Sequence, residues 1–177
     1  MQQNTEQPPG LTTLGLADNQ TGTQTAEDAI AEGHRQQALS GANWFFWIAG
    51  FSIINTIVLL AQGEWNFLIG LGVTQLIDGV AFAAAQELGA AATALALFLD
   101  AMVAGFFVVM GLMARRGFGW AFVLGMAAYA LDALIFLYVQ EWANIAFHAF
   151  ALFFIYRGFA ANGQFRRLRA EAATARG

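Results

Sequence analysis

The stretch from Thr93 to Val109, TALALFLDAMVAGFFVV, decides the fold class, because it is a long apolar run that contains a single carboxylate, Asp100. A charged side chain at the centre of a bilayer costs at least about 2.5 kcal/mol, so it normally faces a partner, a cavity or a binding site. Three other apolar runs also carry an ionisable residue, namely Asp78, Asp132 and His148. We therefore expect a membrane protein whose helices meet at a polar interior.

The composition also indicates a membrane protein. Of the 177 residues, 58% are hydrophobic and only 11% are charged, whereas charged residues make up about a quarter of an average soluble protein. The mean hydropathy is +0.54. Between residues 43 and 156 the apolar residues form long runs separated by short polar breaks, and each run approaches the ~20 residues that a helix needs to cross the hydrocarbon core.

The apolar runs predict an all-α bundle of five transmembrane helices. All five Trp residues fall within a few residues of a predicted helix end, as expected for aromatic belts at the membrane interface. Short connections force neighbouring helices to pack antiparallel. In one alternative, a segment is a re-entrant hairpin instead of a full crossing, and the second is the best candidate. The predicted spans cover residues 43–61, 65–85, 89–113, 119–139 and 142–160.

The N-terminal part of the chain is predicted to lie outside the transmembrane bundle, which covers residues 42–161. Residues 1–24 are rich in Gln, Thr, Asn, Gly and Pro without a hydrophobic period, so we expect a disordered tail. Residues 25–41 begin with a Thr-x-x-Asp pattern that resembles a capping box. This pattern predicts a short amphipathic helix at the membrane surface, with a solvated tail as the alternative.

The C-terminal tail, residues 162–177, is predicted to continue the last helix with a basic surface. Arg166, Arg167 and Arg169 are candidate contacts for anionic lipid headgroups, which attract basic residues by about 1 kcal/mol each. The cluster would also be explained by a role in enforcing membrane topology alone.

The distribution of Arg residues predicts an orientation. Arg115 and Arg116 lie two spans before the Arg residues of the C-terminal tail, so both groups share a side, which the positive-inside rule makes cytoplasmic. Five crossings then place the N-terminus outside. Residues 1–42 carry five acidic residues and one Arg, a net charge of −4, and residues 157–177 carry five Arg and one Glu, a net charge of +4. We therefore expect a multi-pass protein of a bacterial inner (plasma) membrane.

The polar residues inside the predicted spans are expected to share one depth. Counted from the outer end of each helix at about 1.5 Å per residue, the four ionisable residues lie roughly 9 to 16 Å deep, and polar residues of the first helix lie roughly 14 to 18 Å deep. We therefore predict one polar layer in the outer half of the bundle. The candidate intramembrane polar or ion site comprises Asp78, Asp100, Asp132, His148, Gln75, Asn55 and Tyr129.

Helical periodicity adds neighbours within this layer. Gln75 and Asp78 are three residues apart and share a face. Tyr129 lies three residues before Asp132, so its phenol is expected within reach of that carboxylate. On the last helix, polar residues line up from the outer surface inward to His148. A stripe of this kind facing lipid would leave each group unpaired, so the stripes are expected to face the bundle interior.

Two functions follow from this layer. In the first, the polar groups fix which helix packs against which, and the protein is a non-catalytic accessory or structural subunit of a membrane assembly. Its partners would be the bilayer and other membrane subunits or further copies of itself. In the second, three carboxylates and an imidazole form the site of a proton- or cation-coupled transporter or channel, because no strong cation lies in the layer to neutralise them. A pocket for a lipid or hydrophobic ligand is a third interpretation.

The sequence argues against an enzyme. The chain has no Cys, and neither of its two serines, Ser40 and Ser52, lies in a Gly-x-Ser-x-Gly-like turn. A zinc hydrolase needs several His or Cys ligands, but only His148 lies within a span, because His34 belongs to the N-terminal segment. No phosphate-binding loop is present. We therefore expect no catalytic residue, cofactor or metal ligand set, and no nucleic-acid partner.

Overall fold

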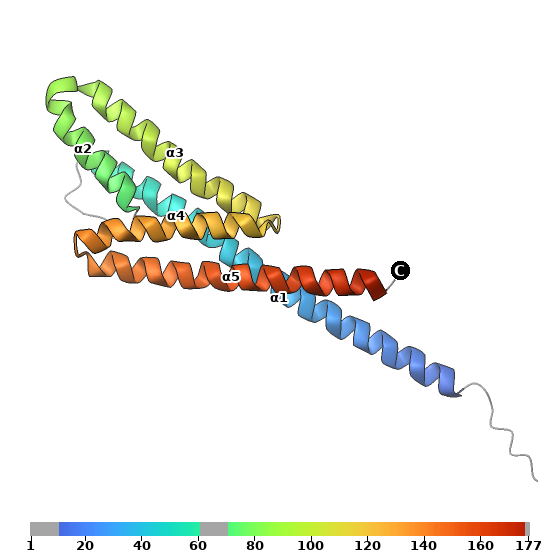
Figure 1. Cartoon of the computed structure of the whole chain (residues 1–177). Coiled ribbons are helices and arrows are strands. Elements are labelled where there is room, and N and C mark those ends of the chain that lie inside the picture. The colour runs from blue at the N-terminus through green and yellow to red at the C-terminus, as the bar shows by residue number, and fades with distance from the viewer. Residues whose placement is uncertain (1–10, 61–70, 176–177) are drawn as a thin grey trace, which may run out of the picture.

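The computed structural model describes the backbone of residues 11–60 and 71–175, with side chains within residues 26–58, 71–85 and 89–175. Every element in this part of the chain is a helix. All except the second are long and apolar enough to cross a membrane, which agrees with the predicted class. The helices are α1 (Leu11–Leu60), α2 (Gly72–Leu88), α3 (Ala90–Arg115), α4 (Gly119–Tyr138) and α5 (Trp142–Ala175) (Figure 1).

The first helix is longer than the sequence pattern predicted. α1 runs for 50 residues without a break, through most of the predicted disordered tail (1–24) and all of the predicted surface helix (25–41). The Thr-x-x-Asp pattern therefore lies inside a helix and does not start one. The chain has no proline after Pro9, so no residue of α1 lacks the backbone N–H that a helix needs.

The second helix is short and starts inside the bundle. α2 has 17 residues, which span about 25 Å, less than the hydrocarbon core of about 30 Å. Leu71 and Gly72 are buried at its start, and the helix runs outward to the end of the bundle where α1 also ends (Figure 1). The start of the predicted second span, in residues 61–70, lies outside the described residues.

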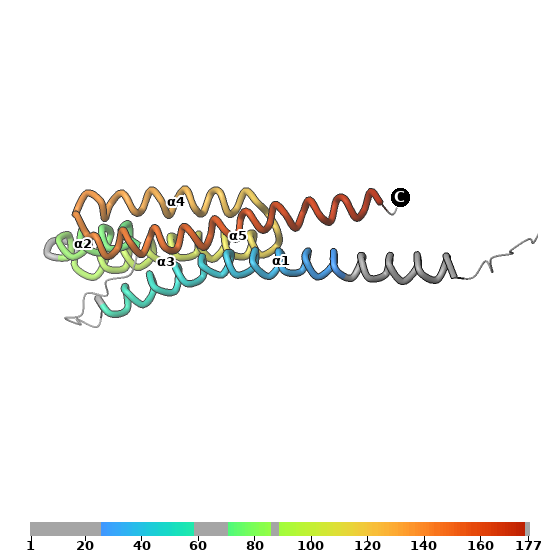
Figure 2. Tube along the Cα trace, turned by 90° about the horizontal axis from the view of Figure 1, so that it is seen from below, coloured from blue at the N-terminus to red at the C-terminus, as the bar shows by residue number. Residues whose placement is uncertain are grey.

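The beginning of α1 and the end of α5 lie at the same end of the bundle (Figure 2). The orientation predicted from the sequence, with the N-terminus outside and the C-terminus cytoplasmic, counts the second segment as a full crossing and stays a prediction. In the structure α1, α3, α4 and α5 alternate in direction, and α2 does not cross between the two ends. The described Arg side chains all lie on the parts of the helices toward this shared end: Arg35, Arg115, Arg116, Arg157, Arg166, Arg167 and Arg169.

Glycines allow the helices to approach closely. A Cβ atom on Gly41 of α1 would lie 2.5 Å from the Cα atom of Gly158 on α5, so the two backbones touch where the helices cross. On α4, a Cβ atom on Gly125 would lie 2.4 Å from a ring carbon of Phe45. Phe45 packs there between α3 and α4 and contacts the ring of Phe122, with the ring centroids 6.2 Å apart. Small residues therefore set the spacing of the bundle.

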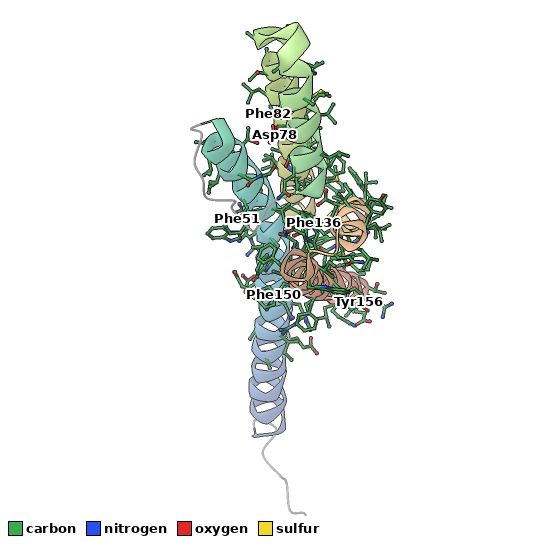
Figure 3. All side chains as sticks on the ribbon, turned by 90° about the vertical axis from the view of Figure 1, so that its left-hand side faces the viewer. Phe51, Asp78, Phe82, Phe136, Phe150 and Tyr156 are labelled. Carbon is green, nitrogen blue, oxygen red and sulfur yellow. The ribbon has the colours of Figure 1, made fainter. Side chains whose placement is uncertain are left out.

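The outer faces of the helices are apolar. The α2–α3 hairpin rises away from α4 and α5, which Figure 3 shows almost end-on, and it carries Asp78 and Phe82. Phe82 is 77% exposed and Leu131 on α4 is 66% exposed. Exposed apolar surface of this extent is rare on soluble monomers and is typical of a surface that contacts lipid.

Candidate functional site

Buried polar side chains from all five helices meet in the part of the bundle around the start of α2. All four ionisable residues that the sequence analysis selected are buried. Their contacts group them in two neighbouring centres, Asp132 with His148 and Asp78 with Asp100. The buried polar residues of this region are Ser52, Thr56, Thr74, Asp78, Asp100, Asp132, Asn144 and His148.

The first centre holds the start of α2. The carboxylate of Asp132, on α4, accepts hydrogen bonds from the backbone N–H groups of Gly72 and Val73, each at 2.8 Å. The first N–H groups of a helix have no partner within the helix, and Leu71 at the N-cap position provides none. Asp132 supplies the missing acceptors, and its negative charge suits the positive end of the helix dipole.

His148 on α5 completes this centre. Its Nδ1 atom lies 2.8 Å from the backbone oxygen of Asn144, and a carbonyl oxygen only accepts, so Nδ1 carries a proton. Its Nε2 atom lies 2.9 Å from Oδ2 of Asp132. The imidazole and the Asp132 carboxyl group therefore share a hydrogen bond, in addition to the two amide groups that donate to Asp132. We call Asp132, His148 and the amide groups of Gly72 and Val73 the α2 clamp.

Aromatic rings enclose the imidazole of the α2 clamp. Tyr129 stacks on His148 with the ring centroids 4.2 Å apart and the planes at 16°, and Phe136 lies on it at 5.1 Å. The sequence analysis expected the Tyr129 phenol to reach the carboxylate of Asp132, but the structure uses the ring of Tyr129 against the imidazole.

A polar path connects the α2 clamp to the end of the bundle. Nδ2 of the buried Asn144 donates to Oε2 of the exposed Glu141 at 2.9 Å. Glu141 stands in the α4–α5 turn, directly after Gln140, whose backbone is left-handed with a φ of 60°. The stripe that the sequence placed on the last helix therefore runs from the surface to His148.

The second centre is made of two carboxyl groups. Asp78 of α2 and Asp100 of α3 are buried neighbours. Thr56 of α1 donates to Oδ2 of Asp100 at 3.2 Å. Asp78 Oδ2 and Asp100 Oδ1 are buried without a hydrogen-bond partner among the described residues. We call Asp78 and Asp100 the acid pair.

Hydroxyl groups lie between the two centres. Oγ1 of Thr56 also lies 3.3 Å from the backbone oxygen of Ser52, and the Ser52 hydroxyl lies 3.4 Å from that of Thr74. Thr74 in turn donates to the carbonyl oxygen of Leu71 at 2.9 Å, beside the amides that the α2 clamp holds. The acid pair and the α2 clamp are therefore neighbours along one polar seam.

Two residues of the predicted polar site make fewer contacts than the others. Asn55 and Gln75 are only half-buried and form no side-chain hydrogen bond with another described residue. Within the described residues no group of three His, Cys, Asp or Glu side chains is placed to hold a metal ion. Sequence reasoning did not select Thr56, although it lies one turn after Ser52 on the same face of α1.

The three Arg residues proposed for headgroup contact lie on the part of α5 that extends beyond the bundle. Arg166, Arg167 and Arg169 are all exposed. The guanidinium of Arg169 lies over the ring of Phe165, 5.5 Å from its centre. This contact restricts the position of the Arg169 side chain. Contact with lipid headgroups stays a prediction.

No protein-family model matches this chain, and no curated protein or solved structure is significantly similar to it.

Proposed function

We propose that this protein is a small integral membrane protein that carries or conducts protons or other cations through the acid pair. The observation that carries the proposal is that Asp78 and Asp100 are buried next to each other, each with an oxygen unpartnered among the described residues. Ionisable residues inside membrane helices are expensive to bury and typically mark ion or proton paths.

The chemistry of two adjoining carboxyl groups supports this proposal. If both were ionised, two like charges would face each other away from water, which is strongly unfavourable. None of the Arg or His side chains that the structure describes forms an ion pair with either group. A proton or a cation from outside the protein would then neutralise the acid pair, and the pair would release it when the surroundings change.

The membrane topology that best accommodates this site has four crossings. In this proposal α1, α3, α4 and α5 cross the bilayer, and α2 belongs to a re-entrant segment whose buried start brings Asp78 against Asp100. The described Arg side chains then share one side of the membrane, which the positive-inside rule makes cytoplasmic. The start of α1 lies on that side as well.

The test is ion flux in liposomes that contain the purified full-length chain and a trapped pH-sensitive dye. We expect flux above that of protein-free liposomes, and we expect Asp78→Asn and Asp100→Asn to bring it to background without loss of helix content. Glu171→Gln is the matched control, because it makes the same carboxyl-to-amide change at an exposed position far along α5 and should keep the flux. Equal flux for the wild type and for Asp100→Asn would contradict the proposal.

A second candidate is a non-catalytic accessory or structural subunit of a membrane assembly. It is favoured by the α2 clamp, in which the carboxylate and both ring nitrogens make direct contacts with protein groups. In this case the partners are other membrane subunits or further copies of the chain. Absence of flux from the wild type, together with co-purification of a defined membrane partner, would favour this candidate.

A further inference from the structure

A side pocket between α1 and α3 reaches Asp100 of the acid pair. Its volume is about 200 Å³, and its lining is mainly aliphatic, with the buried Ser52, Thr56 and Asp100 at its floor. Thr56 and Asp100, which form a hydrogen bond of 3.2 Å, belong to the floor. The pocket is lined by Ser52, Ile53, Thr56, Ile57, Leu97, Asp100 and Ala101.

The mouth of this pocket opens on the apolar outer face of the bundle. Ile53 is 47% exposed and Ile57 is 57% exposed, and Ala101 across the mouth is exposed as well. In a membrane these residues contact acyl chains, because they lie on the helices that are long and apolar enough to cross it. A ligand would therefore reach Asp100 from the hydrocarbon phase of the bilayer.

We propose that this pocket binds the ammonium group of a lipophilic primary amine, with the hydrocarbon chain of the amine leaving between α1 and α3 into the bilayer. This inference rests on the proposed function of the acid pair as a cation site and names the class of cation. An ammonium group has three N–H donors and one positive charge. The carboxyl group of Asp100, which keeps one oxygen without a partner among the described residues, supplies the counter-charge at the floor of the pocket, and the hydroxyl oxygens of Ser52 and Thr56 supply further acceptors.

The lining fits an amine better than a metal ion. Ca²⁺ requires about six to eight oxygen ligands, and the described residues bring no third ligating side chain of the His, Cys, Asp or Glu type to the acid pair. The walls formed by Ile53, Ile57 and Leu97 are suited instead to methylene groups. Pockets for drug-sized ligands enclose about 300 to 1,000 Å³, so this smaller pocket matches a head group and its first few carbons.

The test uses dodecylamine as the probe and native mass spectrometry of the full-length protein in detergent. Dodecanol serves as the neutral control, and dodecyltrimethylammonium serves as a cation without N–H donors. We expect saturable binding of dodecylamine, with weaker binding of both controls by about tenfold or more, as the loss of a charged hydrogen bond implies. Binding of dodecylamine and dodecanol with the same affinity would overturn the inference.

Two variants locate the site. Asp100→Asn should weaken dodecylamine binding by about tenfold or more. Ala101→Phe should do the same by filling the mouth while it leaves both carboxyl groups in place, so a folding defect in the first variant does not decide the result. Full binding by Ala101→Phe would overturn the inference.

The failure of this inference is distinguishable from that of the proposed function. If ion flux depends on Asp100 but dodecylamine does not bind, only the amine site is wrong. If neither flux nor binding depends on Asp78 or Asp100, both proposals fail.

Discussion

The α2 clamp and the acid pair are neighbouring polar centres in one bundle, and they differ in how completely their groups are satisfied. In the α2 clamp, Asp132 faces two amides and an imidazole, so its charge is matched by the protein. In the acid pair, Asp78 and Asp100 face each other, and each keeps an oxygen without a described partner. Burial alone therefore does not distinguish a structural carboxylate from a functional one, whereas its hydrogen-bond partners do.

The largest loss of stability is expected when the carboxylate of the α2 clamp is removed. Asp132→Leu leaves two buried amides and an imidazole without their acceptor, and the loss of one partner of a buried charged pair costs about 3 to 5 kcal/mol. The measurement is the free energy of unfolding in detergent, together with hydrogen exchange at the amides of Gly72 and Val73. Asp100→Leu is the comparison variant, and an equal loss there would remove the distinction between the two centres.

A smaller loss is expected at the imidazole. His148→Leu removes one charged hydrogen bond but leaves both amide bonds to Asp132, so we expect a loss of about 1.5 to 3 kcal/mol in the free energy of unfolding. Because the two residues touch, the Asp132→Leu, His148→Leu double variant should lose less than the sum of the single variants. Strict additivity would show that the pair does not act as a unit.

A still smaller loss of stability is expected when the hydroxyl of Thr56, which donates to Asp100, is removed. Thr56→Val keeps the shape of the side chain and removes the hydrogen bond to Asp100, which corresponds to about 1 kcal/mol of the free energy of unfolding. Thermal unfolding in the same detergent measures it, with Thr93→Val as the control because Thr93 is exposed on α3. A loss as large as that of Asp132→Leu would place Thr56 among the main supports of the fold.

The smallest change in stability is expected at the acid pair itself. Asp100→Asn removes the charge but keeps an amide oxygen that can still accept from Thr56, so the free energy of unfolding should change by less than in Thr56→Val. Ion flux should nevertheless be lost in Asp100→Asn, although this variant is expected to change the stability least. A stability loss comparable to that of His148→Leu would assign the acid pair a structural role.

The sequence predicted the helical class correctly because few structures other than apolar helices accommodate long apolar runs with few charges. It also selected the buried ionisable residues, since each interrupts such a run. It did not predict how they pair. Depth along a helix follows from residue counting, but whether Asp132 meets His148 or Asp100 depends on the tilt and rotation of the helices.

The start of α2 was beyond prediction for a related reason. Leu71 offers no capping side chain, so nothing in the local sequence marks the boundary. The acceptor for the first amide comes from Asp132, 60 residues further along the chain. Composition likewise predicted a tail where α1 is helical, because low hydrophobicity argues against a packed core but does not prevent a continuous helix.

The remote acceptor of α2 also has a consequence for the order in which the chain is assembled. During synthesis α2 leaves the ribosome well before α4, so its first amides have no native acceptor until α4 has been made and has entered the membrane. The α2–α3 hairpin must therefore wait, unanchored at its buried start, for a later part of the same chain. Docking of Asp132 on α4 then supplies the acceptor for the first amides of α2.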